Sequence, residues 1–255
     1  MIQFILTSAA GKRLIAKATA SHPSIKKALN SGTVVIIAGT TNGYVAEELL
    51  KILGQSKDFI RDRFFRGVIL PPNMKTTQTG RLSDESQFPG DVVIVNGVWE
   101  KGKTIFDVVD DLKEGDVIIK GANCIDLIKK KAGILIGHPG GGTIAVALQA
   151  VIGKRVRLIL PVGLEKRISD DIDTIASILN SPGSTGPRLL PVPGEIITEI
   201  EAISILSCAK AMLIAGGGVC GAEGAVRISV EGELKEVETI RRIYDSIADE
   251  PPFLM

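Results

Sequence analysis

The sequence predicts an α/β fold, with a mostly parallel sheet and helices on both faces of it. Continuous runs of β-branched residues, such as TVVIIA at residues 33–38, are typical of strands that are buried on both faces. Segments with apolar residues three and four positions apart, the spacing of an amphipathic helix, alternate with these runs. Glycine-rich polar loops join the two kinds of segment. This alternation favours parallel strands that are connected by helices.

The expected elements follow one another along the whole chain. We expect strands at residues 33–38, 116–120, 133–136, 156–160, 189–192, 211–215 and 225–230. We expect helices at residues 8–20, 23–30, 44–53, 105–112, 124–131, 144–152, 195–207 and 234–247. The runs predicted to be parallel neighbours in one sheet are residues 33–38, 117–119, 134–136, 156–160 and 212–215.

Residues 1–255 are predicted to form a single α/β domain, because the alternation continues almost to the end of the chain. Residues 59–103 depart from the pattern. They hold short apolar runs at residues 67–70 and 91–95, which are separated by polar loops. We interpret this segment as a small β-rich insertion within the domain.

The composition narrows the classes of function. The 30 basic and 29 acidic residues give a net charge of +1, and aromatic residues make up 4% of the chain, so we expect no nucleic-acid partner. The three cysteines lack CxxC spacing, and with two histidines they match no familiar zinc pattern, so we expect no metal site.

The sequence also bears on location. No apolar run is long enough for a signal peptide or a membrane span, and cysteines without a paired framework suit a reducing compartment. We therefore predict a cytoplasmic protein with no membrane partner. The sequence identifies no cofactor and leaves open whether the chain forms a homo-oligomer.

Residues 97–104, GVWEKGKT, match the P-loop pattern GxxxxGK[ST]. A phosphate-binding loop exposes its backbone N–H groups, whereas here Trp99 would crowd a phosphate and Glu100 would repel it. No strand elsewhere ends in the aspartate that would complete a magnesium site. We favour a hairpin from Gly97 to Lys103, and keep a P-loop nucleotide-binding protein as an alternative.

Residues 216–221, GGGVCG, match the dinucleotide-binding pattern GxGxxG after an expected strand. In that motif a helix follows the glycines, and its N-terminus binds the pyrophosphate. Here the next segment, residues 225–230, is predicted to be a strand. We therefore interpret these glycines as a turn that borders a different site.

Three other loops together carry a stronger signal. Residues 39–43, 121–123 and 137–143 each follow an expected parallel strand, so all three are predicted at the carboxyl edge of one sheet, where open α/β sheets bind ligands. Two of them open helices, whose free N–H groups and positive dipole ends favour an anion. Threonine and asparagine at such positions are also ordinary helix N-caps. The convergence of three loops favours a binding site.

The expected ligand-binding residues are the glycines and polar residues of these loops, together with the lysine that ends one strand: Gly39, Thr40, Thr41, Asn42, Lys120, Gly121, Asn123, Gly140, Gly141, Gly142 and Thr143. Lys120 could neutralise a phosphate or a carboxylate. Asp126 is the candidate general base, and His138 is the second candidate catalytic residue. Among the acids of residues 195–207, only Glu195 is expected near the strand edge.

Parts of the chain resemble a known superfamily. Residues 33–41, TVVIIAGTT, followed by a helix, resemble the first strand and turn of the ribose-5-phosphate isomerase, glucosamine-6-phosphate deaminase and CoA-transferase superfamily. Residues 116–126, DVIIKGANCID, are similar to its strand that ends in a Gly-Ala-Asp turn. Gly142 and Thr143, before an alanine-rich helix, resemble the Gly-Thr turn of methylthioribose-1-phosphate isomerases and translation initiation factor 2B regulatory subunits. The similar pieces lie within residues 33–150, with a large gap between the first two.

The resemblance implies a Rossmann-like sheet that binds a phosphorylated small molecule, a nucleotide or a CoA-type ligand at its carboxyl edge. It implies an isomerase- or transferase-like enzyme in which residues 39–42 and 140–143 hold the anion. The isomerases use the aspartate of Gly-Ala-Asp in catalysis, whereas this chain has Asn123, which cannot act as a general base. Two hypotheses therefore stay open: an enzyme of the sugar-phosphate-isomerase-like class, and a non-catalytic module of the same fold that senses a nucleotide or sugar phosphate.

Overall fold

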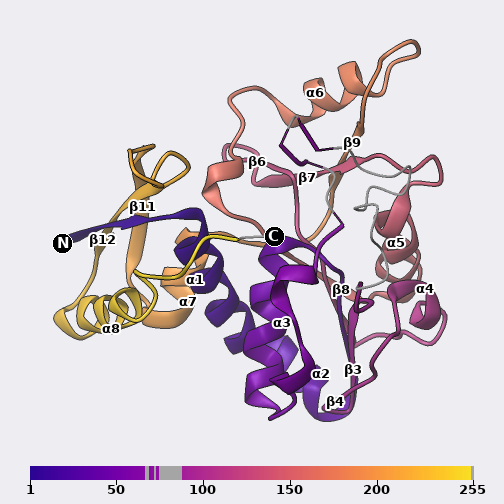
Figure 1. The fold of residues 1–255 in the computed structure, drawn as a ribbon, viewed down its shortest axis with the longest axis horizontal. Coiled ribbons are helices and arrows are strands. Elements are labelled where there is room, and N and C mark those ends of the chain that lie inside the picture. The colour runs from indigo at the N-terminus through magenta and orange to yellow at the C-terminus, as the bar shows by residue number, and fades with distance from the viewer. Residues whose placement is uncertain (67–68, 72, 75–87, 254–255) are drawn as a thin grey trace.

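The computed structural model describes residues 1–66, 69–71, 73–74 and 88–253. Its centre is a six-stranded sheet, called the main sheet, with the strand order β10-β8-β5-β2-β3-β4 (Figure 1). The parallel neighbours are β10 (Glu195–Ile197), β8 (Arg157–Pro161), β5 (Val117–Ile119) and β2 (Thr33–Ile36). Two antiparallel strands, β3 (Val92–Val95) and β4 (Val98–Trp99), extend the sheet beyond β2.

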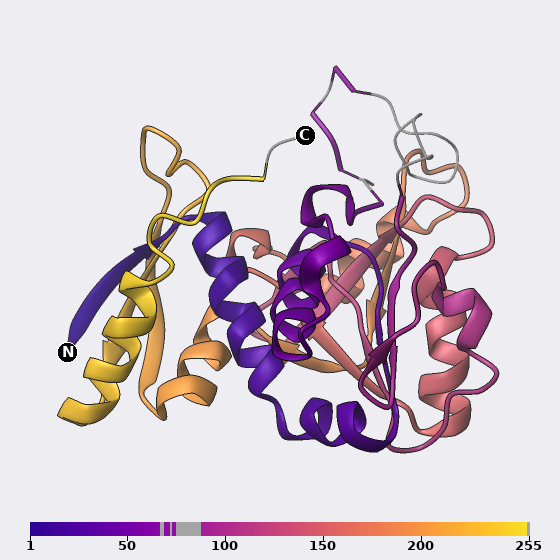
Figure 2. The same ribbon diagram turned by 60° about the horizontal axis from the view of Figure 1, so that its bottom comes forward.

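Helices cover both faces of the main sheet, so its β-branched strands are buried on both sides (Figure 2). Side chains alternate along β2, with Val34 and Ile36 in one core and Val35 in the other. The first core is covered by α1 (Ser8–Ser21), α2 (Pro23–Ser31), α3 (Thr40–Ile52) and α7 (Glu199–Ser207). The second core is covered by α4 (Ile105–Val108) and α5 (Gly142–Lys154).

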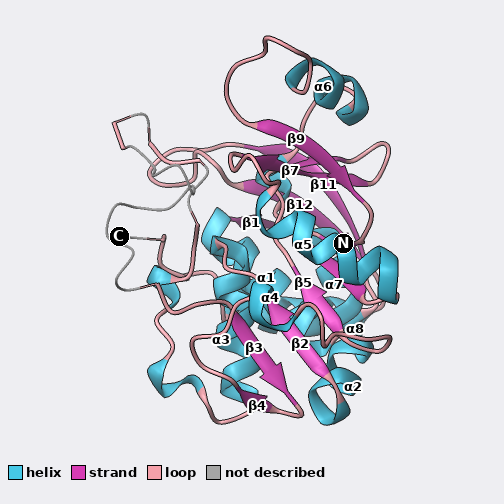
Figure 3. Ribbon diagram, turned by 90° about the vertical axis from the view of Figure 1, so that its right-hand side faces the viewer, coloured by secondary structure: helices cyan, strands magenta, loops and turns pink. Residues whose placement is uncertain are grey.

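Two smaller antiparallel sheets flank this centre. One contains β6 (Cys124–Asp126), β7 (Lys131–Ile136) and β9 (Arg188–Val192), with α6 (Ile172–Leu179) packed against it (Figure 3). The other contains β1 (Ile2–Leu6), β12 (Val226–Glu231) and β11 (Lys210–Gly216), and α8 (Leu234–Asp245) follows it. Short 3₁₀ turns are η1 (Ser56–Asp58), η2 (Arg61–Arg63) and η3 (Leu164–Lys166). A membrane-spanning helix would need a longer apolar stretch than any helix in the described residues provides.

The α/β class is confirmed, and three of the five runs predicted to be parallel neighbours, residues 33–38, 117–119 and 156–160, lie side by side as β2, β5 and β8. The prediction is wrong for residues 134–136 and 212–215, which lie in β7 and β11 of the antiparallel sheets. Parallel strands need a crossover of a dozen or more residues, usually a helix. The connection from β6 to β7 and the connection from β11 to β12 contain no helix, so each pair folds back as antiparallel neighbours.

Two expected helices begin as strands. Residues 124–131 form β6 and a turn, because the carboxylate of Asp126 accepts the backbone N–H groups of Ile128 and Lys129 and closes the chain on itself. Residues 195–197 form β10, and α7 starts only after Thr198, whose side chain caps it in a reciprocal pair with Glu201.

The expected β-rich insertion at residues 59–103 falls partly outside the described residues, since residues 67–68, 72 and 75–87 are not described. The described part contributes β3 and β4 to the edge of the main sheet. These strands therefore continue the main sheet.

A buried charge cluster joins the C-terminal segment to two helices. Arg13 of α1 donates hydrogen bonds to Glu47 and Glu48 of α3 and to Glu250, which lies beyond α8. Its guanidinium carbon lies 4.8 Å from the centre of the Tyr44 ring. The Arg13 side chain is 7% exposed, so the cluster is largely shielded from water.

We predict that Arg13→Met lowers the free energy of unfolding by about 3 kcal/mol or more, because it leaves carboxylates without the cation that compensates their burial. Urea denaturation would measure the change. Lys101→Met, which removes an exposed ion pair with Asp58, is the control and should cost under about 1 kcal/mol. Equal losses in the two variants would contradict this account of the cluster.

Candidate functional site

The four parallel strands of the main sheet end at the same side of it, called here the carboxyl edge. At this edge β2 leads into α3, β5 leads into Lys120 and Gly121, β8 leads towards η3, and β10 leads into α7. Ligands of open α/β sheets bind outside the carboxyl ends of such strands. The polar groups at the carboxyl edge are therefore the first candidates for a functional site.

The first turn of α3 carries two buried oxygen atoms without a partner. Thr41 and Asn42 are 2% and 0% exposed. The Asn42 amide nitrogen donates to the carbonyl oxygens of Ile37 at 2.7 Å and Ile119 at 3.2 Å, which joins β2, α3 and β5. The Oδ1 atom of Asn42 and the Oγ1 atom of Thr41 have no hydrogen-bond partner among the described residues. Buried polar atoms normally have one, so these two mark a place where a ligand or water would bind.

The turn is also open to an approaching group. Gly39 occupies the N-cap position without a side-chain cap, and a Cβ atom added there would meet nothing within 4 Å. The first backbone N–H groups of a helix, here those of Thr40, Thr41 and Asn42, have no acceptor within the helix. They point with the positive end of the helix dipole, which favours an anion.

Lys120 lies at the same edge, directly after β5. Its side chain is half-buried and makes no hydrogen bond or ion pair with the described residues. Burial, and then the cation of Arg66, lower the pKa of Lys120 to about 8, while the charge of Asp91 opposes them. Asp91 is itself engaged, because it accepts hydrogen bonds from Arg66 at 2.8 Å and from the amide of Ala38 at 2.9 Å. Lys120 therefore presents an amine that is not neutralised by a partner.

A second buried acid, Glu199, stands at the carboxyl end of β10. It is 1% exposed, and its Oε2 atom accepts a hydrogen bond from the amide of Leu164 at 2.9 Å. A side chain at position 11 of α1 would collide with this carboxyl group, so Gly11 permits the close packing. Burial, and then the charge of Glu165, raise the pKa of Glu199 to about 8. Glu199 therefore carries a proton at neutral pH.

The structure places Asn123 and Asp126 in supporting positions. The Asn123 side chain accepts a hydrogen bond from the amide of Leu135 and links the start of the β6–β7 hairpin to β7. Asp126 is buried, and hydrogen bonds from backbone N–H groups, led by that of Lys129, lower its pKa. The Oδ1 atom of Asp126 accepts a hydrogen bond from the amide of Ile128 in the turn after β6. Its Oδ2 atom accepts one from the amide of Ile172, at the start of α6, at 3.3 Å.

The loop at residues 137–143 follows β7, so the prediction that it continues a strand of the main parallel sheet is wrong. The loop leads into the N-terminus of α5, and α5 covers the face of the main sheet opposite to the face that α3 covers. His138 is exposed, and its Nδ1 atom accepts the backbone N–H of Gly140 at 3.0 Å. Gly141 has a φ of +80° and Gly142 a φ of +61°, so this turn depends on glycine backbone geometry.

The acid that lies at the carboxyl edge differs from the expected one. Glu195 begins β10, at the opposite edge, and its carboxylate contacts His22 and Arg157, each at 2.9 Å. Glu199, four residues later, lies at the carboxyl edge. The expectation treated residues 195–207 as one helix, whereas a three-residue strand carries the chain across the sheet first.

The two motif matches lie at antiparallel strands: residues 97–104 comprise β4 and its connection to α4, and residues 216–221 comprise the end of β11 and the start of its connection to β12. In residues 97–104, the amide of Trp99 donates to Gln55 and that of Glu100 donates to the carbonyl of Val93, while Lys103 pairs with Glu100. Residues 97–99 belong to the hairpin of β3 and β4, and residues 100–104 lead on to α4, so the hairpin lies earlier in the chain than the expected one from Gly97 to Lys103. Residues 217–221 follow β11 as a turn, as interpreted.

Asp91 and Glu199 are site residues that the sequence did not single out. Asp91 stands directly before β3, after Pro89 and Gly90, and an acid between a turn and an apolar run is a signal that could have drawn attention to it. Glu199 follows Thr198, the N-cap residue of α7, and no sequence signal separates it from an ordinary acid in the first turn of a helix.

Comparison with known proteins identifies no family for this chain. No protein-family model matches its sequence, and no curated protein matches it. The function of the chain is therefore inferred from the geometry of the carboxyl edge.

We predict that Glu199→Gln changes how stability depends on pH. The pKa of Glu199 lies near 8 in the folded state and near 4.5 in the unfolded state, so folding is penalised increasingly as the pH rises from 4.5 to 8. The wild type should lose about 2–4 kcal/mol of unfolding free energy relative to the variant over this range. Urea denaturation at several pH values measures it, with the exposed Glu231→Gln as control. Parallel pH profiles of wild type and Glu199→Gln would contradict the assignment.

We predict that Gly141→Val lowers the free energy of unfolding by about 2 kcal/mol, because a β-branched residue is strained at a φ of +80° and its Cβ would lie 2.7 Å from that of Ala145. Gly153→Val, in the same helix with open space around it, is the control. Because α5 covers the opposite face from α3, we expect inorganic phosphate to stabilise the wild type and Gly141→Val equally in a thermal shift assay, through an anion site at the α3 turn alone. Loss of that stabilisation would show that residues 140–143 hold the anion.

Proposed function

We propose that this protein binds a phosphorylated small molecule at the carboxyl edge of the main sheet and acts on it as an isomerase-like enzyme. The observation that carries the proposal is the buried, unpartnered hydroxyl of Thr41 on an open helix N-terminus, because a hydroxyl can donate to an anion. The unpartnered Oδ1 atom of Asn42 is an acceptor, so it suits a hydroxyl group of the same ligand. The resemblance of residues 33–41 to a sugar-phosphate-binding turn supports the same site.

The phosphate group fits the first turn of α3. Backbone N–H groups of Thr40, Thr41 and Asn42 can donate to its oxygens, and the helix dipole adds a favourable field. The Thr41 hydroxyl, which lacks a partner, can donate one further hydrogen bond. Hydrogen bonds to a charged acceptor are about twice as strong as neutral ones, so few donors suffice.

The reacting part of the ligand fits near Lys120. With a pKa of about 8, about a tenth of this amine is neutral at pH 7, which suits a group that takes and returns a proton. Isomerisation of a sugar phosphate moves a proton between neighbouring carbons, so it needs one residue that can act in both directions. In this proposal Lys120 replaces Asp126 and His138 as the acid–base residue, because it lies at the carboxyl edge beside the α3 turn.

A sensing module is the alternative. Asn123 stands where the isomerases that residues 116–126 resemble have a catalytic aspartate, and its side chain accepts a hydrogen bond from the Leu135 amide. The carboxylate of Asp126 is engaged with backbone N–H groups. A chain that keeps the phosphate site without that carboxylate would bind the ligand without converting it.

We predict that Thr41→Val reduces phosphate binding and that Lys120→Met removes turnover. Thermal shift with inorganic phosphate and a panel of sugar phosphates should show stabilisation of the wild type. Thr41→Val should weaken binding about tenfold, the effect of one charge-assisted hydrogen bond. Thr239→Val, on the exposed face of α8, is the matched control.

Turnover of the sugar phosphate that stabilises best is then followed by NMR. Lys120→Met should lower the rate about 100-fold or more if the amine transfers the proton. Equal phosphate stabilisation of wild type and Thr41→Val would contradict the anion site. Binding without turnover in the wild type would favour the sensing module.

A further inference from the structure

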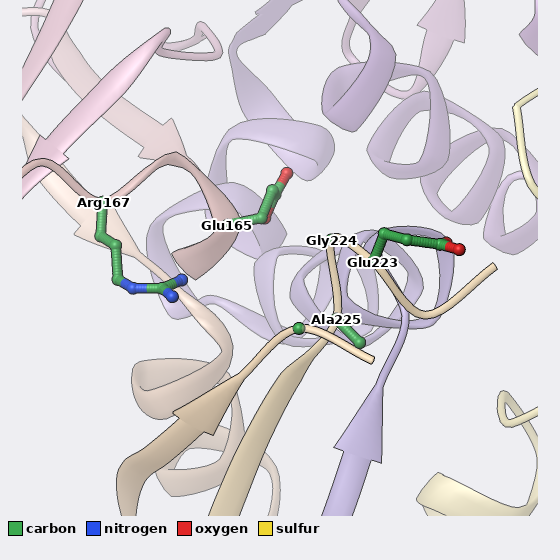
Figure 4. Close-up of a pocket in the computed structure, with 6 residues that line it drawn as sticks. Glu165, Arg167, Glu223, Gly224 and Ala225 are labelled. Carbon is green, nitrogen blue, oxygen red and sulfur yellow. The ribbon is translucent and has the colours of Figure 1, made fainter. Parts of the chain in front are cut away.

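A small pocket lies at the other end of the carboxyl edge, where η3 meets the connection from β11 to β12. Its volume is about 260 Å³, and its lining comprises Glu165, Arg167, Gly217, Glu223, Gly224 and Ala225 (Figure 4). Pockets for drug-sized ligands have volumes of roughly 300–1,000 Å³, so this one suits a smaller molecule. The function proposed above does not use this pocket.

The pocket contains a carboxylate oxygen that no hydrogen-bond donor of the described residues contacts, although the charge of nearby Lys166 attracts this carboxylate. The Oε2 atom of Glu165 is buried and has no hydrogen-bond partner among the described residues. The neighbouring cation, Lys166, is held elsewhere, because its ammonium donates to the carbonyl oxygen of Ala122 at 2.8 Å. A side chain at Gly163 would collide with the Glu165 carboxylate, so the glycine permits its position. A buried carboxylate without a donor is costly, and a ligand ammonium group would satisfy it.

The pocket also presents a guanidinium that is free to bind an anion. Arg167 donates through Nη1 to the carbonyl oxygen of Leu164 at 3.1 Å and forms no ion pair with the described residues. A Cβ atom on Gly216 would lie 2.6 Å from Arg167 Nη2, so the glycine at the end of β11 admits this side chain. A guanidinium binds a carboxylate through two parallel hydrogen bonds.

The two opposite charges do not neutralise each other. Glu165 and Arg167 lie two residues apart, and Figure 4 shows their side chains leaving the chain in different directions. The Glu223 side chain, in the same view, extends away from both. The lining therefore holds one guanidinium and two carboxylates, and the pair of Arg167 and Glu165, whose Oε2 atom lacks a donor, is the charge complement of a zwitterion.

We propose that this pocket binds a free α-amino acid, with its ammonium group on Glu165 and its carboxylate on Arg167. A simple anion would be repelled by Glu165, and a simple cation would be repelled by Arg167. The glycines at positions 217 and 224 leave room for backbone approach on the remaining side. The small volume suits a molecule the size of an amino acid.

Isothermal titration calorimetry of the wild-type chain with a panel of free α-amino acids, in both enantiomers, tests the proposal. At least one should bind with a stoichiometry of one. Two analogues of that amino acid, one lacking the carboxylate and the other lacking the amine, should each bind about tenfold more weakly or worse. If no amino acid binds, or if either analogue binds equally well, the proposal is wrong.

Variants identify the binding residues. Glu165→Gln and Arg167→Gln should each weaken binding about tenfold or more, the usual effect of removing one charge-assisted hydrogen bond. Glu231→Gln and Arg227→Gln, exposed on β12, are the matched controls and should bind like the wild type. Circular dichroism checks that each variant is folded.

Inorganic phosphate distinguishes a simpler anion site. Phosphate binding that needs Arg167 and is unaffected by Glu165→Gln would overturn the zwitterion assignment. Wild-type affinity for the amino acid in either variant would also overturn it. The analogue comparison uses only wild-type protein, so the proposal is tested even if a variant fails to fold.

Discussion

Asp91 joins three segments at the carboxyl edge of the main sheet. Its fully buried carboxylate accepts hydrogen bonds from the amides of Ala38 and Ile105 and from the guanidinium of Arg66. The first amide lies just before α3 and the second begins α4, so one carboxylate fixes the starts of helices on opposite faces of the sheet. A carboxylate can be buried at this point only because three donors replace its water. The placement of the α3 turn, and with it the candidate anion site, depends on this group.

Buried acids that hold the fold together differ from the charged residues of the candidate sites in whether they have hydrogen-bond partners. Asp116 and Asp126 each accept at least two backbone N–H groups, as Asp91 does, and they hold turns together. Lys120 and Glu165 lack such partners. The sequence could indicate the α3 turn, because a glycine and polar residues between a buried strand and a helix place free N–H groups at the carboxyl edge of a sheet. It could not show whether Asp126 was free, because that depends on the turn that the acid itself closes.

The fold was predictable to the extent that local pattern decides it. Runs of β-branched residues report burial, and they located β2, β5 and β8 correctly. They do not show which strand lies beside a given strand, or whether the two are parallel. Both depend on the segment that connects the strands. The chain after residue 126 reverses within a few residues, so β7 could not join the parallel sheet, and the loop at residues 137–143 moved away with it. One wrongly predicted connection therefore led to the wrong location for residues 140–143, one of the two loops expected to hold the anion.

The charge of Glu165 links the pocket beside η3 to the carboxyl edge of the main sheet, where Glu199 lies. Glu165 lines the pocket that we propose to bind an amino acid, and its charge is one of the causes that raise the pKa of Glu199 at the end of β10. Glu199 in turn accepts the amide of Leu164, the first residue of η3, so the two carboxyl groups also share a backbone turn. An ammonium group bound to Glu165 would offset the repulsion and lower the pKa of Glu199. By linkage, the protonation of Glu199 and the occupancy of the pocket would then depend on each other, and the pocket would influence the carboxyl edge without direct contact with its ligand.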